Sequence, residues 1–192
     1  MCLPSNRPRC TRRVSSRTVT TRSVSCSLVA RRSAASVAVD VLRASVLEQT
    51  APASEVRDDS VVIPIACLRP QTFYTFRVRL TATSGAIRVL HAATITTQPL
   101  PASVALPPFR LLYADSPSVK YVLVGITPAS NGKSYAIAID REAIPVWYKE
   151  FRDAVVDFQR QPNGQLTAWS SSDGSLPVFY AFDMLGRLAA TY

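Results

Sequence analysis

Histidine and closely spaced cysteines are scarce in this sequence. It has one histidine, His91, and four cysteines without a C-x-x-C pair: Cys2, Cys10, Cys26 and Cys67. Metal sites are commonly built from closely spaced Cys and His ligands, so no metal or cofactor site is predicted. Strand alternation places His91 on an apolar face with Ile87, Val89 and Ile95. We therefore interpret His91 as a partly buried structural residue and predict no catalytic residue.

Helical patterns and long apolar runs are also missing. No long stretch repeats apolar residues at i, i+3, i+4 and i+7, and 14 prolines interrupt the chain. The longest apolar run, Val61 to Leu68, contains Pro64 and is much shorter than the roughly 18 residues that a membrane-spanning helix needs. Because 47% of the residues are hydrophobic, a sizeable core can still be buried. We predict an all-β protein without a membrane span.

Acidic residues are absent before Asp40, and this first part of the chain holds eight of the 22 basic residues and no aromatic residue. The basic residues that follow nearly balance the 13 acidic ones, so the net charge of +9 comes almost entirely from the N-terminal segment. A nucleic-acid groove needs basic side chains along a backbone, commonly beside stacking aromatics. Nucleic acid is therefore not a predicted partner.

Residues 1–22 are rich in Ser, Thr and Arg, a composition that cannot bury enough apolar surface to become ordered. We predict a disordered basic extension. Two alternatives are a wrongly assigned start and an organelle transit peptide, which shares this composition. No apolar core follows the charges, so a secretory signal peptide is not visible, and the compartment is not decided by the sequence.

Residues 23–98 contain the first set of predicted strands. Val37, Val39 and Val41 alternate with Ala38 and Asp40, which predicts a half-buried strand. Val61-Val62-Ile63-Pro64-Ile65 predicts another, at an edge, because proline cannot donate to a ladder. Cys26 and Cys67 could face each other as a disulfide or as two small buried residues, and we favour the second interpretation. Asp58-Asp59 is interpreted as a solvated loop.

The segment Leu68-Arg69-Pro70-Gln71-Thr72-Phe73-Tyr74 leads into a strand on which Tyr74, Phe76 and Val78 share one face. This Leu-x-Pro-x-Thr-x-Tyr approach resembles the fibronectin type III domain. In that domain the tyrosine hydroxyl bonds back to the preceding turn, as a tyrosine corner. Residues 87–97 follow Ser84-Gly85 as the last strand of such a domain would. The resemblance implies a fibronectin III-like β-sandwich over residues 23–98.

Prolines at 99, 101, 107 and 108 predict an extended linker over residues 99–108. Beyond it, residues 109–192 contain short apolar runs separated by Asn131-Gly132, Asn163-Gly164 and Asp173-Gly174. Asn-Gly between strands favours a type I′ hairpin turn, because both residues tolerate a positive φ. These dipeptides predict an antiparallel meander.

The meander contains a repeat. SYAIAIDREAIPVWY is echoed by FYAFDMLGRLAATY, which places Asp183 43 positions after Asp140. A repeat of roughly 40–50 residues made of short strands is typical of β-propeller blades. Residues 109–192 therefore predict an incomplete propeller of about two blades. Trp147 is interpreted as packing between blades, Tyr148 as a core or surface contact, and Trp169 as a possible channel residue.

The order of these elements resembles the N-terminal part of the bacterial-type arylsulfotransferase (aryl-sulfate sulfotransferase) family. The matching features are the fibronectin III-like domain, the proline-bearing linker, Tyr121-x-Leu123, Ala-Ile-Asp-x-x-x-x-Pro-Val-Trp-Tyr over 138–148, and Asp-Phe-x-x-x-Pro-Asn-Gly-x-Leu over 157–166. The resemblance implies sulfuryl transfer from an aryl sulfate donor to a phenolic acceptor, through a histidine on a six-bladed propeller, in an extracytoplasmic location. Ala143 stands where the family's turn carries glycine, and none of the family's active-site residues matches a position here.

Two repeats are too few to close a propeller ring, which takes about 4–8 blades. We therefore expect the N-terminal fragment of an arylsulfotransferase-like protein, inactive as given because the catalytic histidine lies beyond this chain. One alternative is a non-catalytic extracellular binding or adhesion protein with the same modules. Another is a quinone-dependent dehydrogenase-like propeller, whose blades carry a similar Ala-x-Asp…Trp repeat. The downstream reading frame would distinguish the three.

Overall fold

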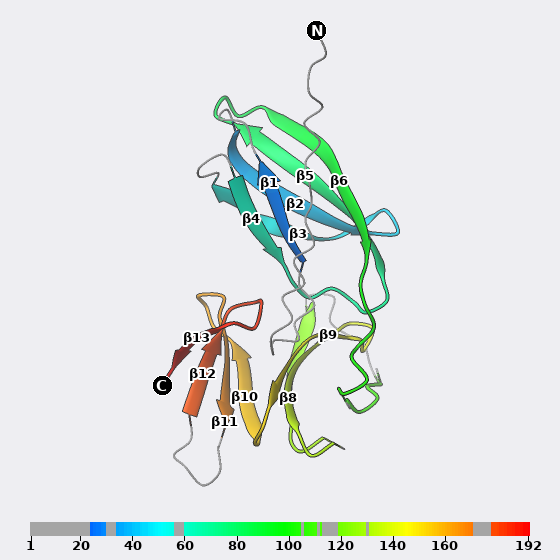
Figure 1. Ribbon diagram of the computed structural model, residues 1–192, viewed down its shortest axis with the longest axis vertical. Coiled ribbons are helices and arrows are strands. Elements are labelled where there is room, and N and C mark those ends of the chain that lie inside the picture. The colour runs from blue at the N-terminus through cyan, green and yellow to red at the C-terminus, as the bar shows by residue number, and fades with distance from the viewer. Residues whose placement is uncertain are drawn as a thin grey trace. The chain divides into compact units, whose positions relative to one another are not determined.

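The computed structural model describes residues 24–29, 34–55, 60–104, 106–110, 112, 119–129, 131–170 and 178–192. These residues form antiparallel strands and no helix (Figure 1), which confirms the predicted all-β class. Accordingly, the described part of the chain contains no helix long and apolar enough to span a membrane. The predicted extension 1–22, Asp58-Asp59 and Asp173-Gly174 lie outside the described residues.

The described residues divide into two compact units, 24–65 with 71–97, and 66–70 with 98–192. The first unit contains a two-stranded sheet, β1-β4, and a four-stranded sheet in the order β3-β2-β5-β6. Their bounds are β1 Val24–Val29, β2 Ala34–Arg43, β3 Val46–Glu55, β4 Ser60–Ile65, β5 Phe73–Ala82 and β6 Ile87–Thr96. The fully buried side chains include Val37, Val39, Val41, Tyr74, Phe76 and Val78, so the alternation predicted for these two strands is confirmed.

Strand β6 departs from the predicted pattern. Ile87 and Val89 are exposed rather than buried in the core, so that prediction is wrong. The register of β5 and β6 shifts between Phe76, which pairs with Ala93, and Arg77, which pairs with His91. One extra residue in β6 reverses the face of every residue before it. The side chain of His91 lies outside the described residues.

The second unit is a meander of two antiparallel sheets (Figure 1). The first sheet has the order β7-β8-β9 and the second the order β10-β11-β12-β13. Their bounds are β7 Tyr121–Ile126, β8 Ser134–Asp140, β9 Pro145–Phe151, β10 Val155–Arg160, β11 Leu166–Ser170, β12 Val178–Phe182 and β13 Leu188–Thr191. Neither sheet closes on itself.

The two sheets share an apolar core, which we call the inter-sheet core. The first sheet contributes Ala136, Ala138, Val146, Trp147 and Phe151, and the second contributes Val155, Phe158, Leu166, Ala168 and Phe182. Trp147 is 1% exposed and its ring stacks on Phe158 at 5.4 Å between centroids. Trp147 therefore packs between the two sheets; that these sheets are propeller blades stays a prediction.

The opposite face of the first sheet is covered by a second cluster, which we call the outer core. Its buried members include Tyr135, Ile137, Ile139 and Tyr148. Leu100, Val104, Leu106 and Phe109 pack against them. The proline-rich stretch predicted as a linker over 99–108 thus contributes side chains to the second unit, and the first sheet is covered on both faces.

The turn at Asn163-Gly164 is not the predicted type I′ turn. Gly164 has φ of 85°, whereas Asn163 is not among the residues with positive φ. The Gly164 amide donates to the Gln161 carbonyl at 2.9 Å, and the Gln161 amide donates to the Gln165 carbonyl at 2.8 Å. Pro162 and Gly164 suit the second and fourth places of a type I turn, so the hairpin has the longer, bulged form.

Candidate ligand pocket and the repeated aspartate turns

The repeat predicted from Asp140 and Asp183 is present in the main-chain hydrogen bonds. The amide of Asp140 donates to the Ile144 carbonyl at 3.0 Å, and the amide of Asp183 donates to the Arg187 carbonyl at 3.0 Å. In each turn the fourth residue donates back to the aspartate carbonyl, Ala143 at 3.0 Å and Gly186 at 2.8 Å. The two turns therefore have the same backbone structure.

Each aspartate also holds its turn through Oδ1. This oxygen of Asp140 accepts from the amides of Glu142 at 2.9 Å and Ile144 at 3.1 Å. The same oxygen of Asp183 accepts from the amides of Leu185 and Arg187, both at 2.9 Å. A short polar side chain that satisfies two nearby amides stabilises a tight turn, which explains why aspartate begins both.

The fourth residue of each turn has a left-handed conformation, with φ of 62° at Ala143 and 74° at Gly186. Glycine adopts this conformation at no steric cost, whereas a Cβ atom makes it unfavourable. Ala143 thus takes the same left-handed conformation as Gly186, and its backbone is strained.

The two aspartates differ in the partner of Oδ2. Asp140 Oδ2 pairs with Arg69 Nε at 2.6 Å, and Arg69 also contacts Glu142 at 2.5 Å. Asp183 Oδ2 pairs instead with Arg187 Nε at 2.5 Å, within its own turn. The Arg69–Asp140 side chains are largely buried, whereas Arg187 is mostly exposed. The first turn thus depends on a distant arginine, and the second is self-contained.

Two side chains of the first sheet also donate hydrogen bonds to carbonyls of the second aspartate turn. Trp147 Nε1 donates to the Met184 carbonyl at 3.1 Å, and Lys149 Nζ donates to the Gly186 carbonyl at 3.1 Å. The ammonium of Lys149 lies 4.7 Å from the centre of the Phe182 ring. Partial burial lowers the pKa of Lys149, although Asp183 opposes this shift. These contacts tie β9 to the second sheet.

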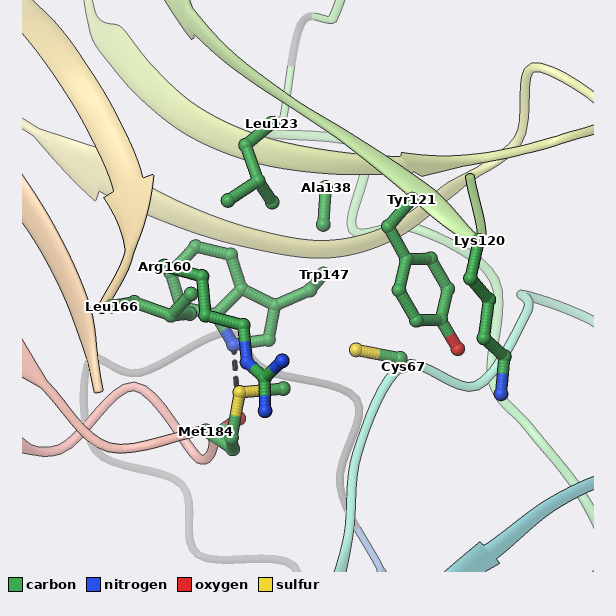
Figure 2. Close-up of a pocket in the computed structure, with 9 residues that line it drawn as sticks. All are labelled: Cys67, Lys120, Tyr121, Leu123, Ala138, Trp147, Arg160, Leu166 and Met184. Carbon is green, nitrogen blue, oxygen red and sulfur yellow. Dashed lines mark hydrogen bonds between the residues drawn. The ribbon is translucent and has the colours of Figure 1, made fainter. Parts of the chain in front are cut away.

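A pocket of about 240 Å³ opens beside this junction, within the second unit (Figure 2). Its apolar wall is formed by Leu123, Ala138, Trp147, Leu166 and Met184, and its polar part by Cys67, Lys120, Tyr121 and Arg160. Figure 2 shows the guanidinium of Arg160 and the Tyr121 hydroxyl near the Cys67 thiol, with the Lys120 ammonium beyond it. The pocket is thus apolar inside and positively charged at one side.

The Cys67 thiol is free, so it does not form the disulfide considered for it. Burial raises its pKa from the ordinary 9.0 to about 11, although Lys120 and Arg160 act in the opposite direction. The thiolate is the nucleophilic form, and a thiol with this pKa stays protonated at neutral pH. The pocket therefore has the chemistry of a binding site and lacks an activated cysteine. The Cys26 side chain lies outside the described residues.

Other residues considered from the sequence lie away from this pocket. Tyr148 belongs to the outer core, and Trp169 lies on β11, where it pairs in register with Val156 and Phe179. Among the described residues, no group of three His, Cys, Asp or Glu side chains could hold a metal ion. Sequence reasoning did not find Lys120 or Arg160, because the pocket residues come from segments that no short motif connects.

A small amphipathic anion would fit this arrangement. An apolar body would contact Trp147 and Leu123, and its charged group would lie near Lys120 and Arg160. Apolar pockets with a few polar groups that fix orientation are typical of small-molecule sites. The sequence matches no protein-family model, no curated protein and no solved structure.

Proposed function

We propose that this chain belongs to an arylsulfotransferase-like protein, in which the second unit forms propeller repeats and carries no sulfuryl-transfer centre of its own. The observation that carries the proposal is the pair of matching aspartate turns 43 residues apart, with the same hydrogen bonds from Asp140 and Asp183. Repeated four-stranded meanders that pack face to face are the building unit of propellers.

We expect no transfer activity because the second unit contains no histidine. Sulfuryl transfer in the related family uses a histidine nucleophile, and His91 is the single histidine of this sequence. His91 lies on β6 in the first unit, outside the repeats. The aryl sulfate donor and the phenolic acceptor would bind the complete propeller.

The test measures transfer of the sulfuryl group from 4-nitrophenyl sulfate to a second phenol by the purified chain. The release of 4-nitrophenolate is monitored as the signal. We expect no release above the rate without protein. The matched control is the His91→Ala variant. Turnover by the parent chain that is lost in His91→Ala would show that His91 transfers the group, and the proposal would be wrong.

A second candidate is a non-catalytic binding protein, and the observation that favours it is the pocket beside Trp147. Binding of phenyl sulfate, benzoate and phenyl phosphate can be followed by tryptophan fluorescence and calorimetry. If the pocket is a binding site, Arg160→Gln weakens binding, and Arg88→Gln, an exposed arginine of the first unit, leaves it unchanged. Equal effects of the two variants, or no saturable binding by the parent chain, would exclude this candidate.

A further inference from the structure

Two Asn-Gly pairs of the second unit lie in turns with the same main-chain hydrogen bonds. The first turn runs from 161 to 165 and contains Asn163-Gly164, and the second lies between Ala129 and Lys133 and contains Asn131-Gly132. In each turn the glycine amide donates to the carbonyl of the first residue at 2.9 Å. Both glycines have a positive φ, of 85° and 75°, and both asparagines are exposed. The two pairs thus form a matched set.

An asparagine followed by glycine can react with its own main chain, and asparagine is among the thermolabile residues. The glycine nitrogen loses its proton to solvent and bonds to the asparagine Cγ. A five-membered succinimide ring closes, and the side-chain nitrogen takes up a proton and leaves as ammonia. Water then opens the ring at either carbonyl, which gives aspartate or isoaspartate. Apart from adjacent residues, no described atom lies within 4 Å of a Cβ added at Gly132 or Gly164, so both glycines lie in open space.

The side chain of Asn131 is held from outside its turn. Its Nδ2 donates to the Tyr135 hydroxyl at 2.8 Å and to the Ser103 carbonyl at 3.1 Å. Tyr135 is fully buried in the outer core, and Ser103 adjoins Val104, which packs against that core. Because Cγ has to swing toward the Gly132 nitrogen before the ring can close, both bonds have to break first. The fold therefore protects Asn131.

The side chain of Asn163 is held only locally. Among the described residues it bonds to Gln165 alone: Nδ2 donates to Oε1 at 2.8 Å, and Oδ1 accepts from the amide at 3.0 Å, both exposed to solvent. Asn131 has the counterpart of the second bond, from the Lys133 amide at 3.1 Å, so the turns differ at Nδ2. A bond between two exposed amide side chains competes with water and contributes little.

We propose that Asn163 is a site of spontaneous deamidation in the folded protein, and that the fold protects Asn131 from the same reaction. The product carries a negative charge, and isoaspartate also lengthens the main chain of the turn by one atom. The turn joins Arg160 to Leu166, which pair across β10 and β11 and both line the pocket (Figure 2). The reaction thus adds an acidic group to the hairpin that carries the guanidinium of the pocket. The proposal rests on neither proposed function.

The test follows both asparagines in one sample. The full chain is incubated at mildly alkaline pH, folded or in urea, and digested with trypsin after increasing times. Cleavage after Lys133 and Arg160 places the two asparagines in separate peptides, whose deamidated forms are quantified by chromatography and mass spectrometry, with Asn163→Asp as a standard. In the folded chain we expect Asn163 to convert at least about tenfold faster than Asn131, because the bonds of Asn131 must break first. In urea the two rates should become similar.

A matched pair of variants tests the cause of the difference. Tyr135→Phe removes one acceptor of Asn131 Nδ2 and should accelerate conversion of Asn131 by about threefold or more, without changing the rate at Asn163. Gln165→Ala removes the acceptor of Asn163 Nδ2 and should change the rate at Asn163 by less than about twofold. Circular dichroism verifies that both variants are folded. If Tyr135→Phe does not fold, the comparison with urea, which needs no variant, decides.

Three results would overturn the proposal. The first is conversion of Asn131 in the folded chain at a rate equal to or above that of Asn163. The second is an intact Asn163 in the folded chain after the unfolded chain has fully converted. The third is an equally large difference between the two rates in urea, which would assign the difference to the neighbouring residues in the sequence and not to the fold.

Discussion

The Thr127 hydroxyl bonds to Val155 in both directions. Its Oγ1 accepts from the Val155 amide at 2.7 Å and donates to the Val155 carbonyl at 3.2 Å. These two bonds connect the end of β7 to the first residue of β10, and therefore the first sheet to the second. The backbones of β7 and β10 lie close together here. A Cβ atom added at Gly125 would lie only 2.7 Å from the Val155 carbonyl oxygen.

Thr127→Val is expected to lower the free energy of unfolding by about 1–3 kcal/mol, because it leaves the buried Val155 amide without its acceptor. Thr127→Ser keeps the hydroxyl and is expected to cost much less. Urea titration followed by circular dichroism measures both values. Equal losses in the two variants would show that the methyl group, and not the hydrogen bonds, matters at this joint.

The left-handed residues of the two aspartate turns give a reciprocal pair of variants. Ala143→Gly is expected to raise the free energy of unfolding by up to about 1 kcal/mol, because it relieves the strain of a positive φ. Gly186→Ala is expected to lower it by about 1–2 kcal/mol for the same reason. Thermal melting measures both. A loss in both variants would mean that packing of the Ala143 methyl group in the outer core exceeds the backbone strain.

The two aspartates should respond differently to loss of charge. Asp140→Asn is expected to cost about 2–3 kcal/mol, because Arg69 keeps its contact with Glu142 but loses a largely buried, charge-assisted bond to Asp140. Asp183→Asn keeps an oxygen that can accept the turn amides and loses only an exposed pair with Arg187, worth about 0–1 kcal/mol. Chemical unfolding of both variants tests this order. A larger loss from Asp183→Asn would contradict the assigned roles.

Alkylation should detect the protonated thiol in the pocket. In a chain with Cys2, Cys10 and Cys26 changed to serine, Cys67 should react slowly with iodoacetamide at neutral pH and faster as the pH approaches its pKa of about 11. In the unfolded chain the thiol ionises near 9.0. Between these values the unfolded state loses its proton first, so stability is full below pH 9 and falls as the pH rises.

The reaction is followed by mass spectrometry, with denatured protein as the reference. Arg160→Gln is a useful companion variant. It removes one of the charges that favour the thiolate, so the pH at which reactivity rises should increase further. A native Cys67 that reacts as readily at neutral pH as the denatured one would show that the pocket does not shield it.

Alternation and repeat spacing predicted most of the strands. The period of two identified the buried face of Tyr74, Phe76 and Val78, and the echo of Asp140 at Asp183 predicted two equivalent turns. The alternation is a property of a single strand, and the echo compares two short segments of sequence, so each can be recognised without the tertiary structure. They required no knowledge of how the sheets pack.

The failures arose where the backbone changes register or where distant segments meet. The bulge in β6 exposes Ile87 and Val89, and nothing in their own sequence distinguishes them from core residues. Only Gly164 of the Asn163-Gly164 pair takes a positive φ, so the two-residue turn that Asn-Gly predicts is replaced by a longer one. The pocket side chains of Lys120 and Arg160 come together only through tertiary packing, which no spacing rule encodes.

The ion pair of Arg69 has a consequence for how the chain reaches its native state. Arg69 and Glu142 are 73 residues apart, whereas Asp183 finds Arg187 four residues away. Closing a long loop delays the contacts that depend on it. The hairpin at Asp183 should therefore form early in refolding. The hairpin at Asp140 should become protected from hydrogen exchange only after the segment around Arg69 has packed against it.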